Sequence, residues 1–231
     1  VNGIDYDEFN PETDPDIARN FNVDNFRKEK VKNKIALQKE LGLAEDPKMM
    51  MIGVVSRLTD QKGFDLVSCV MDELCQDAIQ IVVLGTGEEQ YENMFRHFAW
   101  KYPDKVSAQI YYSEPMSHKI YASCDAFLMP SLFEPCGLSQ LMSLRYGTVP
   151  IVRETGGLKD TVEPYNEYEK TGTGFSFANY NAHEMMATVR YAEQIYYDKK
   201  RDWNKIAERG MQQDFSWNNS ARLYEELYES M

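Results

Sequence analysis

Residues that bind metal ions or form disulfide bonds are scarce in this sequence. It contains three His and four Cys, with no CxxC pair and no HExxH segment, so neither a metal site nor a disulfide framework is expected. We expect the four Cys to be reduced, mostly buried thiols of a cytoplasmic protein. Two segments with DxD spacing, Asp5-Tyr6-Asp7 and Asp14-Pro15-Asp16, lie in an irregular polar stretch and are interpreted as surface turns.

Long apolar runs and an excess of positive charge are also absent. No run approaches the roughly 18 apolar residues of a membrane span, and the first residues lack the basic and apolar regions of a signal peptide. Because Lys and Arg number 25 against 37 Asp and Glu, the net charge is -12. This balance disfavours nucleic acid and membrane surfaces as partners, since both attract a basic face. The first residue is Val, so we expect the chain to begin within a longer protein.

What the sequence does contain is a regular alternation of short apolar segments and amphipathic segments. Fully apolar short strands separated by helices indicate an α/β fold, with a parallel sheet covered by helices on both faces. The predicted strands are 50–55, 79–84, 106–112, 126–130 and 148–152, with a last short strand at 174–177. The predicted helices are 25–41, which Gly42 would end, then 64–74, 88–102, 115–124, 137–146, 181–198, 203–213 and 217–231.

Composition divides the chain into three predicted parts. Residues 1–24 are rich in Asn, Asp and Pro and are interpreted as a linker or lead-in. Residues 25–214 are expected to form one Rossmann-like domain. Residues 215–231 form a C-terminal helix whose aromatic side chains would pack toward a further domain outside this chain.

The stretch from Ser131 to Gln140 lies where a predicted strand passes into a helix. In an open parallel sheet this crossing is at the carboxyl end of a strand, where ligands bind. A helix that begins at Gly137 would direct free N–H groups toward a phosphate, and Glu134 could accept hydrogen bonds from hydroxyl groups. A nucleotide sugar carries both of these groups, with a phosphate toward one end and sugar hydroxyls at the other. The stretch alone equally favours a Pro/Gly turn with a surface Glu.

A second strand-to-helix loop carries two cations. Arg57 and Lys62 flank a turn, and Gly63 precedes the next helix. The helix dipole disfavours cations at this position, so their presence favours an anionic ligand such as a diphosphate. The alternative is a solvated charged loop.

Three further features follow strands. Gly85-Thr86-Gly87 lacks the third Gly of a dinucleotide fingerprint and is weak evidence for NAD, so a tight turn is the safer interpretation. Tyr111 or Tyr112 could stack on a base, or pack at the sheet edge. Gly156-Gly157 would allow a close approach of ligand to backbone. Because every one of these crossings follows a strand, all are expected at the carboxyl edge of one sheet.

These segments together closely resemble the glycogen synthase and starch synthase family. The similar segments are Ser56-Arg57-Leu58 with Gln61-Lys62-Gly63, Leu84 to Gly87, Pro130-Ser131 with Phe133 to Leu138, Thr155 to Leu158 with Asp160-Thr161-Val162, and the terminal Asn2 to Asp5 and Phe215 to Trp217. The resemblance covers essentially the whole chain.

The resemblance implies the C-terminal, Rossmann-like half of a GT-B fold. It further implies transfer of glucose from ADP-glucose to the non-reducing end of an α-1,4-glucan, with retention of configuration and without a cofactor or metal. The glucan would bind through an N-terminal half that is not in this chain. The chain alone is therefore expected to bind ADP or ADP-glucose without catalysing transfer.

The resemblance also assigns roles to residues. Arg57 and Lys62 would hold the diphosphate and stabilise the leaving ADP, Glu134 would bind the glucose hydroxyls, and Tyr112 would lie near the adenine. Other implied nucleotide contacts are Gly85, Gly87, Cys136, Gly137, Leu138, Ser139, Thr155, Gly156 and Gly157. Many related retaining transferases carry a second Glu where this chain has Met142, a departure shared by bacterial glycogen synthases. Two alternatives stay open: another retaining GT-B transferase with a different nucleotide sugar, or a non-catalytic nucleotide-binding module.

Overall fold

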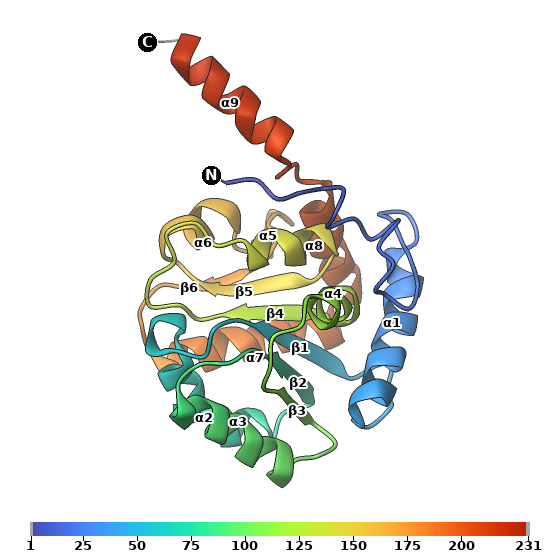
Figure 1. The fold of residues 1–231 in the computed structure, drawn as a ribbon, viewed down its shortest axis with the longest axis vertical. Coiled ribbons are helices and arrows are strands. Elements are labelled where there is room, and N and C mark those ends of the chain that lie inside the picture. Colours follow the sequence, from blue (N-terminus) through green and yellow to red (C-terminus); the bar gives the residue numbers. More distant parts are fainter. Residues whose placement is uncertain (1, 230–231) are drawn as a thin grey trace.

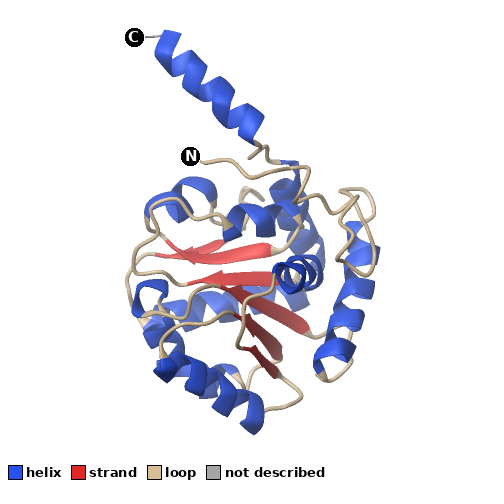
Figure 2. Ribbon diagram, viewed as in Figure 1, coloured by secondary structure: helices blue, strands red, loops and turns tan. Residues whose placement is uncertain are grey.

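Six parallel strands form one sheet in the computed structural model, which describes residues 2–229 (Figure 1). Their spatial order is β3-β2-β1-β4-β5-β6, and every neighbouring pair is parallel. Helices cover both faces of the sheet (Figure 2). The prediction of an α/β fold with a Rossmann-like parallel sheet is confirmed. The strands are β1 (Met50–Val55), β2 (Ile79–Leu84), β3 (Val106–Gln109), β4 (Ala126–Met129), β5 (Val149–Arg153) and β6 (Phe175–Phe177).

The helices account for most of the remaining chain. They are α1 (Phe26–Leu41), α2 (Phe64–Leu74), α3 (Glu89–Lys101), α4 (Glu114–Ser123), α5 (Ser139–Arg145), α6 (Gly156–Thr161), α7 (Ala182–Asp198), α8 (Lys200–Gln212) and α9 (Trp217–Glu229). Two predicted helix ends are confirmed. Gly42 adopts φ 70° after α1, a conformation that suits glycine. The side chain of Asn181 accepts hydrogen bonds from the N–H groups of His183 and Glu184 at the start of α7.

Apolar side chains on both faces of the sheet explain why the strands are buried. All six residues of β2 are buried, as are five of the six in β1. Such strands can lie only in the middle of a sheet with helices above and below it. Burial of this surface is the main favourable contribution to folding. Because the strands are parallel, their carboxyl ends lie along one edge of the sheet.

Several predicted boundaries are wrong. The fifth strand is followed by a short helix, α6, where only a flexible glycine pair was predicted. Residues 60–62 form a 3-10 turn. Strand β3 ends at Gln109, so Tyr112 lies in the following loop, and α5 begins at Ser139 and not at Gly137. Helix α8 begins at Lys200, three residues before its predicted start, because its first turn is polar and lacks an apolar signal.

The N-terminal segment packs on the domain although it contains no helix or long strand. Phe9, Ile17 and Phe21 are buried, and Asp14 is 2% exposed. The Asp14 carboxylate lies 2.6 Å from His118 Nδ1 and accepts a hydrogen bond from the Tyr146 hydroxyl. The interpretation of this segment as a surface turn is therefore wrong for Asp14.

The cysteines and the C-terminal helix complete the comparison. Cys75 and Cys124 are buried as expected, but Cys69 and Cys136 are exposed, so the expectation of mostly buried thiols holds for only half of them. Helix α9 extends away from the body of the domain (Figure 1), with Trp217 54% exposed. Its docking against a further domain stays a prediction. Among residues 2–229, no helix has the length and apolar character needed to cross a membrane.

Candidate nucleotide-sugar site

The candidate site lies where the order of the strands reverses. From β1 the chain continues to β2 and β3 on one side, whereas β4, β5 and β6 lie on the other. The loops after β1 and β4 therefore leave the sheet in opposite directions and open a crevice at its carboxyl edge. The Arg57–Lys62 loop follows β1, and the Glu134 loop follows β4.

Two adjoining cavities occupy this crevice. The smaller, of about 290 Å³, is lined by Lys62, Ser131 and Glu134, among other residues. The larger, of about 510 Å³, extends along Gly85 and Thr86 to Tyr112. Five lining residues are common to both cavities: Val55, Ser56, Arg57, Leu138 and Ser139. The two volumes therefore form one continuous groove from Glu134 to Tyr112, of the size that ligand pockets have.

An ion pair between Lys62 and Glu134 closes one end of the groove. Lys62 Nζ lies 2.6 Å from Glu134 Oε2, and Ser131 Oγ donates to the same oxygen at 3.2 Å. The Glu134 side chain is only 9% exposed. Its other oxygen, Oε1, receives no hydrogen bond from the described part of the chain, so it is the acceptor left for a ligand hydroxyl.

Backbone contacts hold the two loops together beside this pair. The Leu132 N–H donates to the Gln61 carbonyl at 3.0 Å. Gly63 adopts φ 82°, and a Cβ atom there would lie 2.0 Å from the Pro130 carbonyl oxygen. Only glycine fits this close approach, which brings Lys62 within reach of Glu134 across 72 positions of sequence.

Arg57 differs from Lys62 because its guanidinium has no partner among the described residues. It is exposed and lines both cavities. A guanidinium without a carboxylate partner retains all its donors for a bidentate anion. In a protein with a net charge of -12, an unpaired cation of this kind within a groove indicates an anionic ligand.

The segment Gly137 to Ser139 presents backbone donors to the groove. Gly137 adopts φ 66°, and α5 begins two residues later. Within residues 2–229, the N–H groups of Gly137, Leu138 and Ser139 donate no hydrogen bond to the protein. The buried side chain of Gln140 donates to the carbonyls of Cys136 and Gly137 at 3.1 Å and so fixes the turn.

Gly156 and Gly157 contact the Glu134 loop. The Gly157 N–H donates to the Glu134 carbonyl at 3.0 Å, and a Cβ at Gly156 would lie 2.1 Å from the same oxygen. A Cβ at Gly157 would lie 1.8 Å from the Cys136 carbonyl. The close approach at these glycines is thus between two segments of this chain. Thr155 precedes them and is partly exposed.

At the other end of the groove, Tyr112 is 87% exposed and Gly85 supports the floor. A Cβ at Gly85 would lie 1.8 Å from the Ser56 carbonyl, and Gly87 forms a bridge with Leu58. The two glycines therefore hold the loop after β2 against the loop after β1. An exposed aromatic ring beside that floor leaves a surface on which a flat base can stack.

Three further residues support the site, although no role was predicted for them: Ser131, Gln140 and Arg153. Arg153 donates to the Leu132 carbonyl at 2.8 Å, and its guanidinium lies 5.5 Å from the centre of the Tyr180 ring. A cation at the carboxyl end of the fifth strand was a signal that could have identified it. Ser131 and Gln140 lie at the two ends of the stretch that the sequence indicated, but no local pattern predicted their contacts.

Two clusters of potential metal ligands share His118 beside the larger cavity. In one its ring lies within 4.8 Å of the carboxylates of Glu8 and Glu114, and in the other within 4.8 Å of those of Asp14 and Asp16. Folding thus gathers potential ligands that are far apart in sequence. However, Asp14 already occupies the Nδ1 atom of His118 at 2.6 Å. The absence of a metal stays a prediction.

The sheet and the groove at its carboxyl edge match the C-terminal, Rossmann-like half of the GT-B glycosyltransferase fold, and the matching family model agrees. That model, "Glycosyl transferases group 1", matches residues 33–210, which is more than half of the chain, so the chain belongs to this family. Within the family, the chain is similar to glycogen synthases. It is 77% identical to glycogen synthase of Lachnospira eligens and 70% identical to that of Lachnoclostridium phytofermentans, each over all 231 residues.

The chain spans about half the length of these curated relatives, 48% in both cases. Among solved structures, the catalytic domain of Starch Synthase IV from Arabidopsis thaliana bound to ADP and acarbose superposes with a TM-score of 0.90, at 34% identity. This chain is matched completely and covers 48% of that one. An Anabaena protein in complex with UDP and glucose shares the fold, with a TM-score of 0.66 and 18% identity. The predicted resemblance and the C-terminal GT-B architecture are confirmed.

Proposed function

We propose that this chain is the donor-binding half of an enzyme that transfers glucose from ADP-glucose to the non-reducing end of an α-1,4-glucan, with retention of configuration. The observation that supports this most directly is the groove itself. It joins an unpaired cation at Arg57, a paired carboxylate at Glu134 and an exposed ring at Tyr112. The names of the relatives and the ADP in the similar starch synthase support the choice of donor.

In this proposal the diphosphate lies between Arg57, Lys62 and the free N–H groups of residues 137–139. Cations and backbone donors stabilise the negative charge that develops on ADP as the bond to glucose breaks. Because the protein supplies this positive charge itself, the proposal requires no metal. Tyr112 provides a stacking surface for adenine at the far end of the groove.

Glu134 binds the sugar in this proposal. Lys62 and Ser131 both contact Oε2, so the carboxylate is oriented while Oε1 stays available to a ligand hydroxyl. Once the diphosphate arrives, it competes with Glu134 for the Lys62 ammonium. Lys62 then lies between the diphosphate of the leaving ADP and the Glu134 carboxylate that binds the glucose. Its positive charge is therefore next to the negative charge that develops on ADP in the transition state.

A calorimetric titration of the chain with ADP, UDP and NAD tests the donor. We expect ADP to bind most tightly, since each charge-assisted hydrogen bond to the diphosphate contributes roughly 1.5–3 kcal/mol. Tighter binding of UDP would favour another GT-B transferase. Preferential binding of NAD, or no binding of any of the three, would contradict the proposal.

Catalysis by the chain alone is a separate question. Arg57 and Tyr112 are exposed in the groove, so water reaches it and dilutes the electrostatic stabilisation that the two cations provide. We therefore expect the 231-residue chain to bind ADP-glucose without labelling glycogen. Labelling at a rate near that of a full-length relative would show that the second half is unnecessary and that the acceptor binds here.

A further inference from the structure

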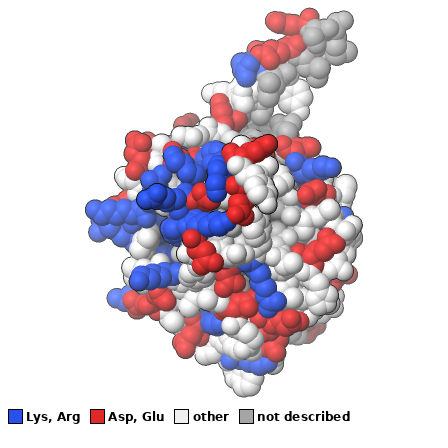
Figure 3. Space-filling model, turned by 180° about the vertical axis from the view of Figure 1, so that it is seen from behind, with Lys and Arg blue, Asp and Glu red and all other residues white. Residues whose placement is uncertain are grey.

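A second cavity lies at the opposite edge of the sheet, where the strands begin. Its volume is about 480 Å³, and it lies between α1, α7, α8 and the segments that precede β1, β4 and β5. Five cationic side chains and one carboxylate line it: Arg27, Lys30, Lys34, Lys48 and Lys200, with Asp125. The lining residues therefore carry a net positive charge, whereas the chain as a whole has a net charge of -12. Figure 3 shows Lys and Arg gathered on the face of the molecule away from the viewer in Figure 1.

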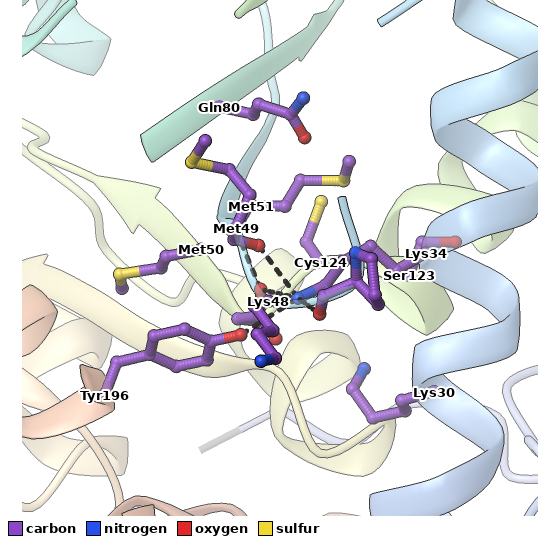
Figure 4. A network of polar contacts seen from close by, with 12 residues as sticks. Lys30, Lys34, Lys48, Met49, Met50, Met51, Gln80, Ser123, Cys124 and Tyr196 are labelled. Atoms are coloured by element: carbon purple, nitrogen blue, oxygen red, sulfur yellow. Dashed lines mark hydrogen bonds and ion pairs between the residues drawn. The ribbon is translucent and has the colours of Figure 1, made fainter. Parts of the chain in front are cut away.

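The two innermost cations are already saturated by the protein. Lys34 Nζ contacts the Asp125 carboxylate at 2.6 Å, the Met49 carbonyl at 2.9 Å and the Tyr196 hydroxyl at 3.0 Å (Figure 4). Lys30 Nζ lies within 3.2 Å of three carbonyls and the Thr148 hydroxyl. These groups fix the floor of the cavity.

The outer cations are different. Among residues 2–229, the ammonium groups of Lys48 and Lys200 have no carboxylate partner; that of Lys200 lies 3.5 Å from the centre of the Tyr196 ring. Desolvation of its ammonium against the Tyr196 ring lowers the pKa of Lys200 to about 8, although the residue as a whole is exposed, and burial lowers the pKa of Lys30 to about 7. Arg27 forms an ion pair with Glu208 at 2.7 Å. A bound anion would supply the missing countercharge.

The rest of the cavity wall is apolar and aromatic. Phe26, Tyr196 and Trp203 line it and are each less than 5% exposed, so their positions are fixed by packing. A cavity of this size holds more than an inorganic ion. Two ammonium groups without a carboxylate partner, beside an apolar wall, fit a doubly charged head group that is joined to a ring.

We propose that the Lys48–Lys200 cavity is a second binding site, separate from the groove at the carboxyl edge, for a small phosphate monoester that carries a ring. Lysine binds phosphate as a point charge without demanding one geometry. The phosphate contacts Lys48 and Lys200 at the mouth, and the ring lies against the apolar wall of the cavity. The proposal does not depend on the function proposed for the groove.

Calorimetric titration of the chain with phenyl phosphate tests this site, with inorganic phosphate and phenol as the two halves of the probe. We expect phenyl phosphate to bind more tightly than either half. The double variant Lys48→Ala/Lys200→Ala should weaken it at least about tenfold, because two charge-assisted contacts are lost. Both residues are exposed, so the fold should persist, which circular dichroism would verify.

Three further variants make the result decisive. Lys39→Ala removes one exposed charge from the last turn of α1, outside the cavity, and should leave the affinity unchanged. Lys48→Arg/Lys200→Arg should retain binding. Arg57→Ala should also leave it unchanged, since Arg57 lies in the other groove. No measurable binding, an unchanged affinity in the double Ala variant, or a loss confined to Arg57→Ala would each overturn the proposal.

Discussion

Two Lys–carboxylate pairs with the same separation stand at opposite edges of the sheet, and their surroundings differ. Lys62 and Glu134 lie 2.6 Å apart at the carboxyl edge, and Lys34 and Asp125 lie 2.6 Å apart at the amino edge. The Lys34 ammonium contacts three further oxygens and the side chain is 2% exposed. The Lys62 side chain is 17% exposed, and among residues 2–229 its ammonium contacts only Glu134.

The difference separates a structural pair from a functional one. Where the protein satisfies the cation completely, the pair joins α1 to the starts of the strands and has no capacity for a ligand. Where the cation has one partner and water can enter, the pair is stable without a ligand yet can exchange that partner. A short distance alone therefore does not identify a binding site; the unused hydrogen-bonding capacity does.

The largest effect should come from breaking the saturated pair. Lys34→Met removes one partner of a buried ion pair and leaves Asp125 uncompensated, which costs about 3–5 kcal/mol of unfolding free energy. Urea denaturation measures it. Lys62→Met is the matched control and should cost distinctly less, since solvent reaches that pair. An equal or larger loss for Lys62→Met would remove the distinction between the two pairs.

The next effect concerns turnover. Joined to the N-terminal half of a full-length relative, this chain with Glu134→Gln should lose about 10²–10³ in kcat, because the amide cannot stabilise positive charge on the glucosyl ring. ADP affinity should be nearly intact. Glu154→Gln, whose carboxylate accepts a hydrogen bond from Ser176, is the control and should leave kcat unchanged. Loss of ADP binding with normal kcat would contradict the role of Glu134.

The smallest effect is the pH dependence of a third pair, buried Asp14 and His118. Burial by itself would lower the pKa of His118, but the hydrogen bond and charge of Asp14 outweigh it and raise that pKa above its usual 6.5. Burial acts in the opposite sense on Asp14, where the hydrogen bonds from His118 and Tyr146 prevail and lower the pKa below 3.8.

The sign of the effect follows from these directions. The folded state holds the His118 proton more tightly, so this stabilisation is complete below pH 6.5 and is lost as pH rises through the folded-state pKa. The Asp14 contribution is present above pH 3.8 and is lost on acidification. Unfolding free energy should thus fall above neutrality by at most about 1.4 kcal/mol per pH unit. Asp14→Asn should flatten this slope, while His183→Gln, at an exposed position, should not. An unchanged slope in Asp14→Asn would contradict the account.

Local patterns were sufficient to predict the sheet and most of its helices, because fully apolar strands and periodic helices are visible in short windows. The groove was predictable in part. Arg57, Lys62 and Glu134 each followed a predicted strand, so the parallel topology brought them to one edge. The Lys62–Glu134 pair itself depends on Gly63 packing against Pro130, a contact between distant segments that no local pattern contains.

The errors have the same origin. Asp14 resembles a turn residue until its partner His118, 104 positions away, is taken into account. Helix α6 was missed because Gly156 and Gly157 disfavour a helix locally, yet the Glu134 loop requires glycine there. The cationic cavity at the amino edge gathers residues from six segments and left no motif in the sequence.

The central claim is that the carboxyl-edge groove keeps its cations available for a diphosphate, and an ADP titration of three variants tests it most directly. Arg57→Ala and Lys62→Ala should each weaken ADP about tenfold or more, since each loses a charge-assisted contact. Lys39→Ala should bind ADP as the unmodified chain does. If both Arg57→Ala and Lys62→Ala bind ADP with unchanged affinity, the groove is not the nucleotide site and the account is wrong.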